Sequence, residues 1–137
     1  MPKSKRGTTN DNFTLNVDLA ATILGAAKAE KPNQYQGRDI SDLYLRPDSP
    51  PWREEFFYEH PIHVNKNVIP ASSALVRKGI KYIQWPDWDV EQIFNLTNDP
   101  KEERDEILNP DYADIHGEMK ARHDELRTLV AKENTQI

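Results

Sequence analysis

The C-terminal part of the chain predicts a long amphipathic helix, and this element constrains the fold more than any other. Asn109 suits a helix N-cap, Pro110 suits the first helical position, and Asp111 adds a favourable negative charge to the first turn. Apolar side chains then recur at spacings of three and four residues, namely Tyr112, Ile115, Met119, Leu126, Leu129 and Val130. Such a helix, about 22 residues or 33 Å long at 1.5 Å per residue, needs an apolar surface to cover.

Four segments upstream of this helix have the residue types of β-strands. Residues 55–60 are rich in aromatic side chains, and residues 90–96 form the last of these segments, ended by Asn98-Asp99-Pro100. Between them, residues 74–77 and 81–85 flank the turn signal Lys78-Gly79 and predict a hairpin. Because a helix covering one face of a sheet is the usual two-layer arrangement, we expect an α+β fold: an antiparallel meander of four strands under the long C-terminal helix.

The beginning of the chain has a different character. Residues 1–12 are polar and predict a flexible tail. Residues 13–17 alternate apolar and polar side chains, which favours a short strand. A helix is expected over residues 18–29, with Asn16 or Asp18 as its cap and with an apolar stripe along one face.

Prolines interrupt the segment that follows. Residues 32–53 contain Pro32, Pro47, Pro50 and Pro51, which favour a surface connection, with a short helix possible around residues 40–45. The expected organisation is a tail over 1–12, an N-terminal helical region with its linker over 13–53, and a compact subdomain over 54–137.

Composition excludes several classes of function. The chain has 137 residues, enough for one ordinary domain, but 30% of them are charged and only 36% are hydrophobic. A net charge of −5 disfavours a nucleic-acid surface. The absence of cysteine excludes disulfides, thiolate metal sites and cysteine nucleophiles. The sequence has neither a long apolar run nor a signal-peptide pattern, so we expect no membrane partner, and the compartment stays open.

The titratable residues do not form a metal-binding motif. His60 and His63 are three residues apart, but Pro61 bends the chain between them, and a zinc site needs three or four ligands. The acidic run over residues 99–106 lacks the order of a calcium-binding loop. His116 and His123 share a helix face and are expected to be exposed or to pack against their neighbours. We therefore expect no metal site in this chain.

Several motifs, in this order, resemble the C-terminal portion of formylglycine-dependent sulfatases, the type I or arylsulfatase-like family. They lie at residues 16–24, 36–40, 56–60, 74–77, 81–83 and 93–102. The resemblance covers about residues 7 to 132, and it departs from the family at Ala21, where the family usually has proline. It implies that the first helix is a remnant of an alkaline-phosphatase-like catalytic domain. It also implies that residues 54–137 are the family's C-terminal subdomain, a four-stranded antiparallel sheet with a long helix.

The catalytic groups of this family precede the part represented here. The family hydrolyses sulfate esters with bound calcium and a formylglycine, so the resemblance implies these cofactors for the complete enzyme and none for this chain. Ser49 begins a match to the family's Ser-x-Pro-x-Arg nucleophile motif. In the family, however, that motif lies near the start of the catalytic domain and is followed by Leu-Thr-Gly, whereas residues 54–56 are Glu-Glu-Phe. We expect the match to be a coincidence, and we expect no catalytic residue.

Substrate contact is the one role that the resemblance carries over. The position matching His60 faces the sugar in some family members, where an imidazole hydrogen-bonds a hydroxyl or a second anionic group. Arg77 is a second candidate, although strand alternation equally allows it to face solvent. The substrate-binding residues expected here are therefore His60 and Arg77.

Three functions remain open. The first is a C-terminal fragment of a sulfatase, inactive alone, either truncated or one piece of a split enzyme, with a separate catalytic domain and a sulfated glycan as partners. In that case Phe13, Leu15, Leu19 and Ile23 should be poorly covered. The second is a stand-alone, non-catalytic module that binds carbohydrate or protein, with an aromatic platform formed by Trp52, Tyr82, Trp85 and Trp88. The third is an independent enzyme that uses Ser49.

Overall fold

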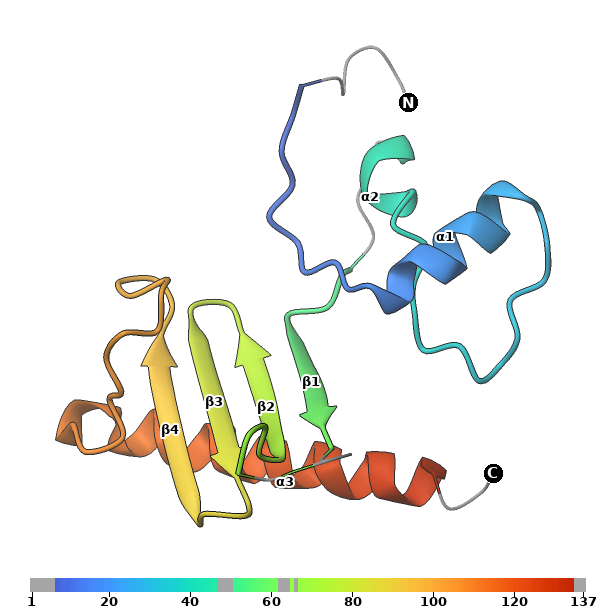
Figure 1. The fold of residues 1–137 in the computed structure, drawn as a ribbon. Coiled ribbons are helices and arrows are strands. Elements are labelled where there is room, and N and C mark those ends of the chain that lie inside the picture. The colour runs from blue at the N-terminus through green and yellow to red at the C-terminus, as the bar shows by residue number, and fades with distance from the viewer. Residues whose placement is uncertain (1–6, 47–50, 62–64, 66, 135–137) are drawn as a thin grey trace. The chain divides into compact units, whose positions relative to one another are not determined.

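The computed structural model describes residues 7–46, 51–61, 65 and 67–134, and the chain divides into two compact units (Figure 1). The N-terminal unit comprises residues 1–54 and the C-terminal unit residues 55–137. The first contains two helices, and the second contains a sheet and a long helix.

The N-terminal unit is built around helix α1 (Val17–Ala26), with the short helix α2 (Asp42–Leu45) after it. The short helix confirms the expectation around residues 40–45. Helix α1 ends three residues earlier than expected, because Lys28 adopts a left-handed conformation with φ of 54°. The expected strand over residues 13–17 is wrong. The Leu15 N–H donates to the Asp18 carboxylate at 2.7 Å, and the Leu15 carbonyl accepts from the Asp18 N–H at 3.0 Å, so this segment forms a turn into the helix.

A buried carboxylate organises the N-terminal unit. The side chain of Asp18 is inaccessible to solvent and accepts hydrogen bonds from both terminal nitrogens of Arg53, with Nη2 at 2.7 Å from Oδ1. The backbone N–H of Arg38 donates to the same oxygen at 2.8 Å. Burial alone would raise the pKa of Asp18, but the hydrogen bonds from Arg53, Arg38 and Leu15 outweigh it and lower the pKa to about 2.

Two further contacts hold the loop after α1 against that helix. The Thr22 hydroxyl donates to the Asp18 carbonyl at 2.7 Å and accepts the Ile40 N–H at 3.1 Å. Gly37 passes so close to α1 that a Cβ at that position would lie 2.0 Å from the carbonyl oxygen of Val17. Only glycine fits this approach.

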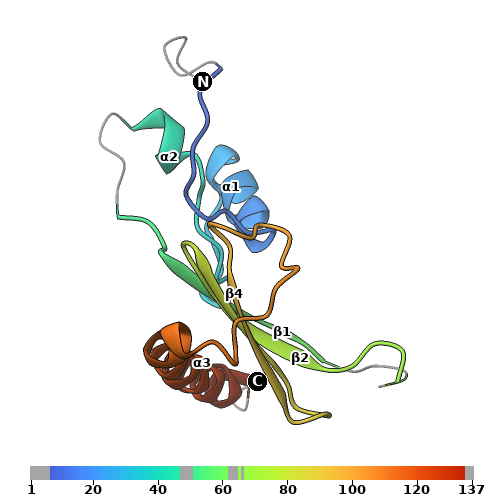
Figure 2. The same ribbon diagram turned by 90° about the vertical axis from the view of Figure 1, so that its left-hand side faces the viewer.

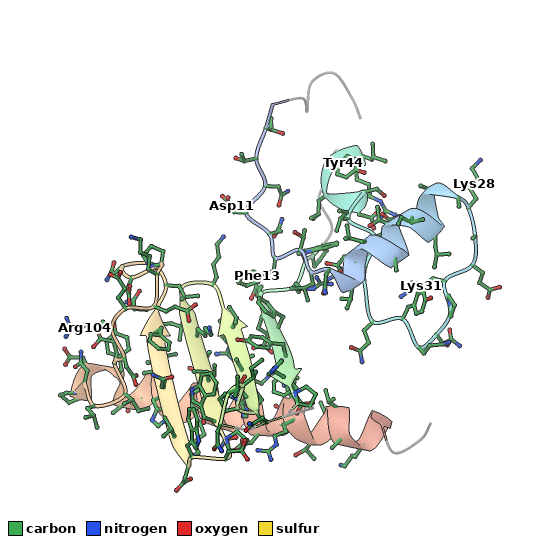
Figure 3. The ribbon with its side chains drawn as sticks, viewed as in Figure 1. Asp11, Phe13, Lys28, Lys31, Tyr44 and Arg104 are labelled. Carbon is green, nitrogen blue, oxygen red and sulfur yellow. The ribbon has the colours of Figure 1, made fainter. Side chains whose placement is uncertain are left out.

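Lys31 closes the same loop on itself. Its ammonium group donates to the carbonyl oxygens of Tyr35 at 3.0 Å and of Gly37 at 3.2 Å. Figure 3 shows Lys31 turned into the loop, whereas Lys28 points away from the helix. The backbone around Gly37 is therefore held from both sides.

The C-terminal unit contains the expected four-stranded antiparallel meander. Its strands are β1 (Glu55–His60), β2 (Ser72–Arg77), β3 (Ile80–Trp85) and β4 (Val90–Asn95), in that spatial order. The predicted hairpin joins β2 to β3, and its turn uses Gly79 with φ of 87°, a conformation that favours glycine. The register places Glu55 opposite Arg77 at one end of β1 and His60 opposite Ser72 at the other.

Helix α3 (Ala113–Asn134) lies across one face of this sheet (Figures 1 and 2). One short turn of 3-10 helix, η2 (Pro110–Tyr112), precedes it, and the Asn109 side chain accepts the Asp111 N–H at 3.1 Å as a cap. The predicted cap at Asn109 is confirmed, although the first turn is 3-10 helix, and α3 itself has the expected length of about 22 residues. The expected α+β class is also confirmed.

Each face of the sheet carries an apolar cluster. On the side of α3, Leu75, Tyr82 and Met119 are fully buried, with Ile80, Ile115 and Leu126 around them. On the opposite face the cluster is formed by Ala74, Ile83 and Phe94, with Trp85 and Leu96 beside them. Each large apolar side chain buried in this way contributes about 1.5–3 kcal/mol. Successive side chains of β2 therefore point alternately into the apolar clusters on the two faces of the sheet.

The Asp18 carboxylate predicts that acid destabilises the N-terminal unit. Its pKa rises from about 2 in the folded chain to 3.8 when exposed, so its stabilisation is complete above pH 3.8 and is lost as the pH falls towards 2. The loss amounts to about 2 kcal/mol. We expect the NMR signal of the Arg38 amide to move in this range. Asp18→Asn should abolish the native Arg38 signal at neutral pH, because Arg53 then lacks its counter-charge. An unchanged signal in that variant would contradict the assignment.

The close approach at Gly37 predicts a steric effect. Gly37→Ala should destabilise the N-terminal unit by about 1–3 kcal/mol or more, because the new methyl group overlaps backbone that cannot move alone. The midpoint of urea unfolding, followed through the indole NMR signal of Trp52, measures this. Gly117→Ala is the matched control, because a Cβ at Gly117 has nothing within 4 Å. Equal stability of the two variants would show that the loop is not held as described.

Candidate functional site

A pocket of about 190 Å³ lies at the end of the sheet where β1 finishes and β2 begins. The turn between β3 and β4 and one side chain of α3 complete its wall. Its lining residues are Glu59, His60, Pro61, Ala71, Ser72, Ser73, Pro86 and Arg127. The pocket therefore combines hydroxyl groups, an imidazole and a guanidinium group.

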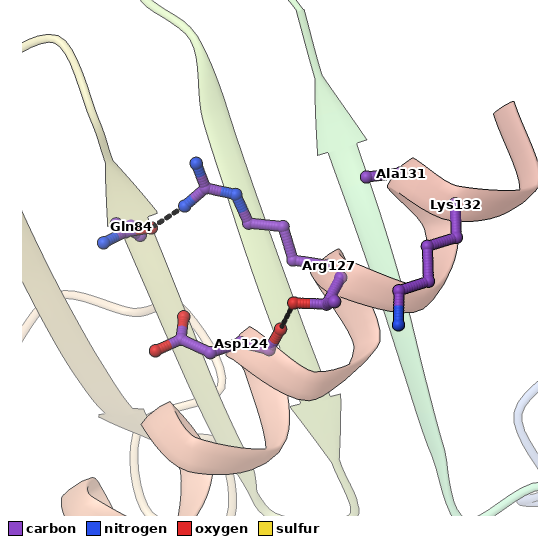
Figure 4. A pocket seen from close by; sticks show the side chains of 6 residues that line it. Gln84, Asp124, Arg127, Ala131 and Lys132 are labelled. Carbon is purple, nitrogen blue, oxygen red and sulfur yellow. Dashed lines mark hydrogen bonds between the residues drawn. The ribbon is translucent and has the colours of Figure 1, made fainter. Parts of the chain in front are cut away.

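A larger and more open depression of about 630 Å³ shares Arg127 with this pocket (Figure 4). It is lined by Gln84, Asp124, Arg127, Thr128, Ala131 and Lys132. In Figure 4 the Arg127 side chain reaches from α3 to Gln84 on β3, and its Nη1 donates to the amide oxygen of Gln84 at 3.0 Å. Arg127 thus lies at the junction of the two hollows.

The polar wall of the smaller pocket is anchored by local hydrogen bonds. The Ala71 N–H, just before β2, donates to the Asp87 carboxylate of the β3–β4 turn at 3.2 Å. This bond joins two parts of the lining that are 16 residues apart. Ser72 and Ser73 follow on β2 with only 8% and 6% of their surfaces exposed. Their backbone positions are therefore fixed by the sheet.

Behind Ser73, a hydrogen-bonded chain runs into the helix. The Ser73 Oγ lies 2.9 Å from Nε2 of His123, and Nδ1 of His123 lies 3.0 Å from the Asp124 carboxylate. This is the order of groups in a Ser-His-Asp triad. His123 is fully buried, however, with Phe57 and Tyr82 packed edge-on against its ring. The hydrogen bond between Ser73 and His123 therefore fastens α3 to β2, and His123 has a structural role in packing.

His60 ends β1 with an exposed side chain on the rim of the smaller pocket. The structure thus places this predicted contact residue beside Ser72, its partner in the strand register, and close to Arg127. Its role in substrate contact stays a prediction. His63, which follows three residues later in the sequence, lies outside the described residues.

Arg77, the other predicted contact residue, is held by carboxylates. Its Nε donates to Glu55 at 2.8 Å, and Nη1 binds Glu118 of α3. These hydrogen bonds raise the pKa of Arg77. Glu55 also binds Arg122 of α3 at 2.7 Å. Burial would raise the pKa of Glu55, but the hydrogen bonds from Arg77 and Arg122 lower it. This network couples β1, β2 and α3.

His60 and Arg77 lie at opposite ends of the same strand pair. Arg77 is opposite Glu55, five positions from His60 along β1. At about 3.4 Å per residue this separates their backbones by about 17 Å. A single sulfo group therefore cannot contact both side chains.

The other motifs noted in the sequence have structural partners or lie outside the described residues. Ser49 lies outside the described residues, while Arg53 of the same motif is bound to Asp18. In the acidic run, Asp99 accepts the Arg104 N–H at 2.9 Å, and Asp105 accepts the Ile93 N–H at 3.1 Å. Within the described part of the chain, no group of three or more His, Cys, Asp or Glu residues is arranged to hold a metal ion.

The four aromatic residues expected in a platform are dispersed. Tyr82 is fully buried in the sheet core, and Trp52 belongs to the N-terminal unit, where the Arg38 guanidinium lies 4.3 Å from its ring centre. Trp85 and Trp88 do form a stacked pair, with ring centres 6.0 Å apart, and 53% of Trp88 is exposed. The platform is thus reduced to these two rings at the β3–β4 turn.

Among the helices in the described residues, none combines the length and apolar character needed to cross a membrane.

Comparison with known proteins identifies the family. Residues 1–129 match the model of the family described as N-sulphoglucosamine sulphohydrolase, C-terminal. The chain belongs to this family. The expected relationship to the C-terminal portion of sulfatases is therefore confirmed.

Two curated relatives are sulfatases. An arylsulfatase of Clostridium perfringens is 29% identical over 131 residues, which cover 96% of this chain and 24% of that enzyme. An N-acetylglucosamine-6-O-sulfatase of Bacteroides thetaiotaomicron is 25% identical over 122 residues, covering 86% of the chain and 22% of the enzyme. The chain therefore spans about a quarter of the length of the curated relatives it matches.

The fold also occurs in a solved structure of a protein in complex with its substrate, D-glucosamine-2-N,6-O-disulfate. The TM-score is 0.78 at 22% sequence identity, and the match covers 89% of this chain and 25% of that protein. At this identity the likeness concerns the fold, which agrees with the architecture described above.

Sequence reasoning missed two residues that shape the pocket region, Ser73 and Arg127. It left His123 as either exposed or packed, and the structure shows it packed; a signal for burial was present, because His123 lies four residues after Met119 in the apolar stripe of the helix. A histidine at such a position is expected to face the sheet and to need a buried partner. Arg127 carried no comparable signal, since its neighbours depend on the packing of α3.

The buried Ser73–His123 pair predicts a characteristic pattern of stabilities. His123→Leu keeps an apolar group between Phe57 and Tyr82 but leaves the Ser73 hydroxyl unpartnered, so it should lower the free energy of unfolding by about 1–3 kcal/mol. The double variant Ser73→Ala/His123→Leu should recover most of this loss, because both polar groups are removed. Urea unfolding followed by circular dichroism measures both. A double variant no more stable than His123→Leu would contradict the coupling.

Proposed function

We propose that this chain is the C-terminal part of a sulfatase that hydrolyses sulfate esters of a carbohydrate, and that it has no catalytic activity by itself. The family membership and the sulfatases among its relatives support the first part. The substrate of the structural neighbour is a sulfated amino sugar, which supports a carbohydrate ester. In this proposal a separate catalytic part supplies the nucleophile and the metal.

The observation that carries the dependence on a catalytic part is the surface of α1. Its sequence, VDLAATILGA, is apolar around most of its circumference, yet only Asp18 and Ala21 are buried. Leu19 is 57% exposed and Ile23 is 68% exposed, as expected for a helix that lacks its cover, whereas Phe13 and Leu15 are half-buried. Helices of this kind belong in the core of a larger domain. We assign this surface to contact with the catalytic part.

Calcium and formylglycine belong to that catalytic part in this proposal. The described residues of this chain do not fit a calcium ion, because no cluster of three or more potential acidic or histidine ligands is present among them. Formylglycine is made from cysteine or serine; the chain has no cysteine, and Ser49, whose motif match is expected to be a coincidence, lies outside the described residues. No catalytic step is therefore assigned to these residues.

His60 is proposed as the residue of this chain that contacts the substrate. It is exposed on the rim of a polar pocket, where its imidazole can exchange hydrogen bonds with a sugar hydroxyl. Arg77 is the weaker candidate, because it would have to exchange an ion pair with Glu55 or Glu118 before binding an anion.

A stand-alone, non-catalytic carbohydrate-binding module is the second candidate. The exposed, stacked rings of Trp85 and Trp88 favour it, because aromatic faces pack well against sugar rings. In this alternative the α1 surface has no catalytic partner.

A chimera tests the leading proposal. The chain replaces the matching C-terminal quarter of the Clostridium perfringens arylsulfatase, and hydrolysis of an aryl sulfate is measured. We expect the chimera to be active and Leu19→Asp/Ile23→Asp to lower its activity at least about tenfold, because burying two carboxylates costs several kcal/mol.

Leu108→Asp is the matched control for the chimera, since Leu108 is 93% exposed in the other unit. It should leave the activity unchanged. Equal effects of the α1 pair and of Leu108→Asp would contradict the assigned interface. Turnover by this chain alone, abolished by Ser49→Ala, would contradict the proposed inactivity and favour an independent enzyme.

A further inference from the structure

We propose that the pocket around Arg127 binds a sulfated amino sugar, with the Arg127 guanidinium as the cation that receives the sulfo group. The choice of a sulfated sugar rests on the proposed function. The pocket is assigned from the charge of Arg127 and from the polar side chains and the Pro86 ring that share its lining.

Arg127 forms no ion pair with a carboxylate among the described residues. Among the described arginines of the C-terminal unit, the three others form ion pairs with carboxylates: Arg77, Arg104 and Arg122. In this same set, Arg127 instead donates to the neutral amide of Gln84 at 3.0 Å. A guanidinium group has five N–H donors in a rigid plane, and this contact uses one of them. The remaining donors suit the oxygens of a sulfo group.

Further polar groups lie beside that charge in the smaller pocket. The Ser73 hydroxyl is bonded to the buried His123, but Ser72 and the exposed His60 also line this pocket. Its volume of about 190 Å³ equals the space of about six water molecules in the liquid. This space accommodates a sulfo group together with part of the sugar that bears it.

Two carboxylates also belong to the linings of the two hollows. Glu59 borders the smaller pocket and Asp124 the larger one, where Lys132 provides a second positive charge. These carboxylates oppose a bare anion. They favour a ligand that presents hydroxyl or ammonium donors beside its anionic group, which is the pattern of an amino sugar sulfate.

An apolar surface for the ring is provided by Pro86, which lines the smaller pocket. Trp88 follows two residues later, but it stacks on Trp85, which belongs to the apolar cluster on the sheet face opposite α3, so this pair is not assigned to the site. A sugar held by Arg127 therefore packs against the Pro86 ring.

The test is an NMR titration of the ¹⁵N-labelled full chain with D-glucosamine 6-O-sulfate. We expect saturable shifts of the Ser72, Ser73 and Arg127 backbone amides, with a Kd of about 1 mM or below, equivalent to about −4 kcal/mol. Unsulfated D-glucosamine and inorganic sulfate form the comparison arms. Each should bind at least about tenfold more weakly, since the first lacks the anionic group and the second lacks the sugar donors.

Arg127→Gln should weaken binding at least about tenfold while leaving the spectrum of the free chain native. Arg104→Gln is the matched control, because this exposed arginine lies in the loop after β4 (Figure 3) and pairs only with the nearby Glu106 among the ion pairs of the described residues. It should not alter the Kd. Unchanged binding in Arg127→Gln, or equal binding of inorganic sulfate, would overturn the proposal.

The titration and the chimera assay fail independently. An active chimera together with no Arg127-dependent binding would overturn the pocket and leave the proposed function standing. Arg127-dependent binding together with an inactive chimera would support the pocket as a site and overturn the proposed sulfatase role.

Discussion

The N-terminal unit depends on one buried carboxylate, that of Asp18. Two nitrogens of Arg53 and the backbone N–H groups of Leu15 and Arg38 converge on it, so segments distant in sequence meet at the start of α1. A charge can be buried only when such donors replace water. Its position also decides the rotation of α1: the polar side of the helix is pinned inward, and the apolar side chains of Leu19 and Ile23 are left outward. The buried side of α1 thus carries its charged residue, and the exposed side carries large apolar residues, which is the reverse of an ordinary surface helix. This arrangement supports an apolar partner on the exposed side.

The fold of the C-terminal unit could be read from the sequence because its signals are local. Strand alternation, the turn at Lys78-Gly79 and the cap at Asn109 each act within a few residues, and the observed elements follow them closely. The segment over residues 13–17 shows the limit of this reasoning. Its alternation was genuine, but the Leu15 N–H is taken by the side chain of Asp18, and a strand needs a neighbour that the local sequence cannot supply.

The candidate site was less predictable, because its residues acquire their roles from partners far along the chain. Arg77 is neutralised by Glu55 across the strand pair and by Glu118 on α3, which are 22 and 41 residues away. Arg127 meets Gln84 43 residues away. Neither relation follows from periodicity, because both depend on the rotation of α3 over the sheet. The resemblance pointed to His60. Its place on the pocket rim follows from the length of β1 and from its register with β2 alone.

The two ends of the β1–β2 strand pair show why equivalent residue types do different work. At the Glu55 end, Arg77 and Arg122 share a carboxylate, and two further glutamates complete their charge balance, so little of their hydrogen-bonding capacity is left for a ligand. At the His60 end, Asp124, which precedes Arg127 by three residues on α3, is bonded to His123, and Arg127 is left with an amide. A desolvated ion pair gains little from an added anion, whereas an arginine with a neutral partner gains a full charge-assisted hydrogen bond. The geometry therefore separates a structural arginine from one available for recognition.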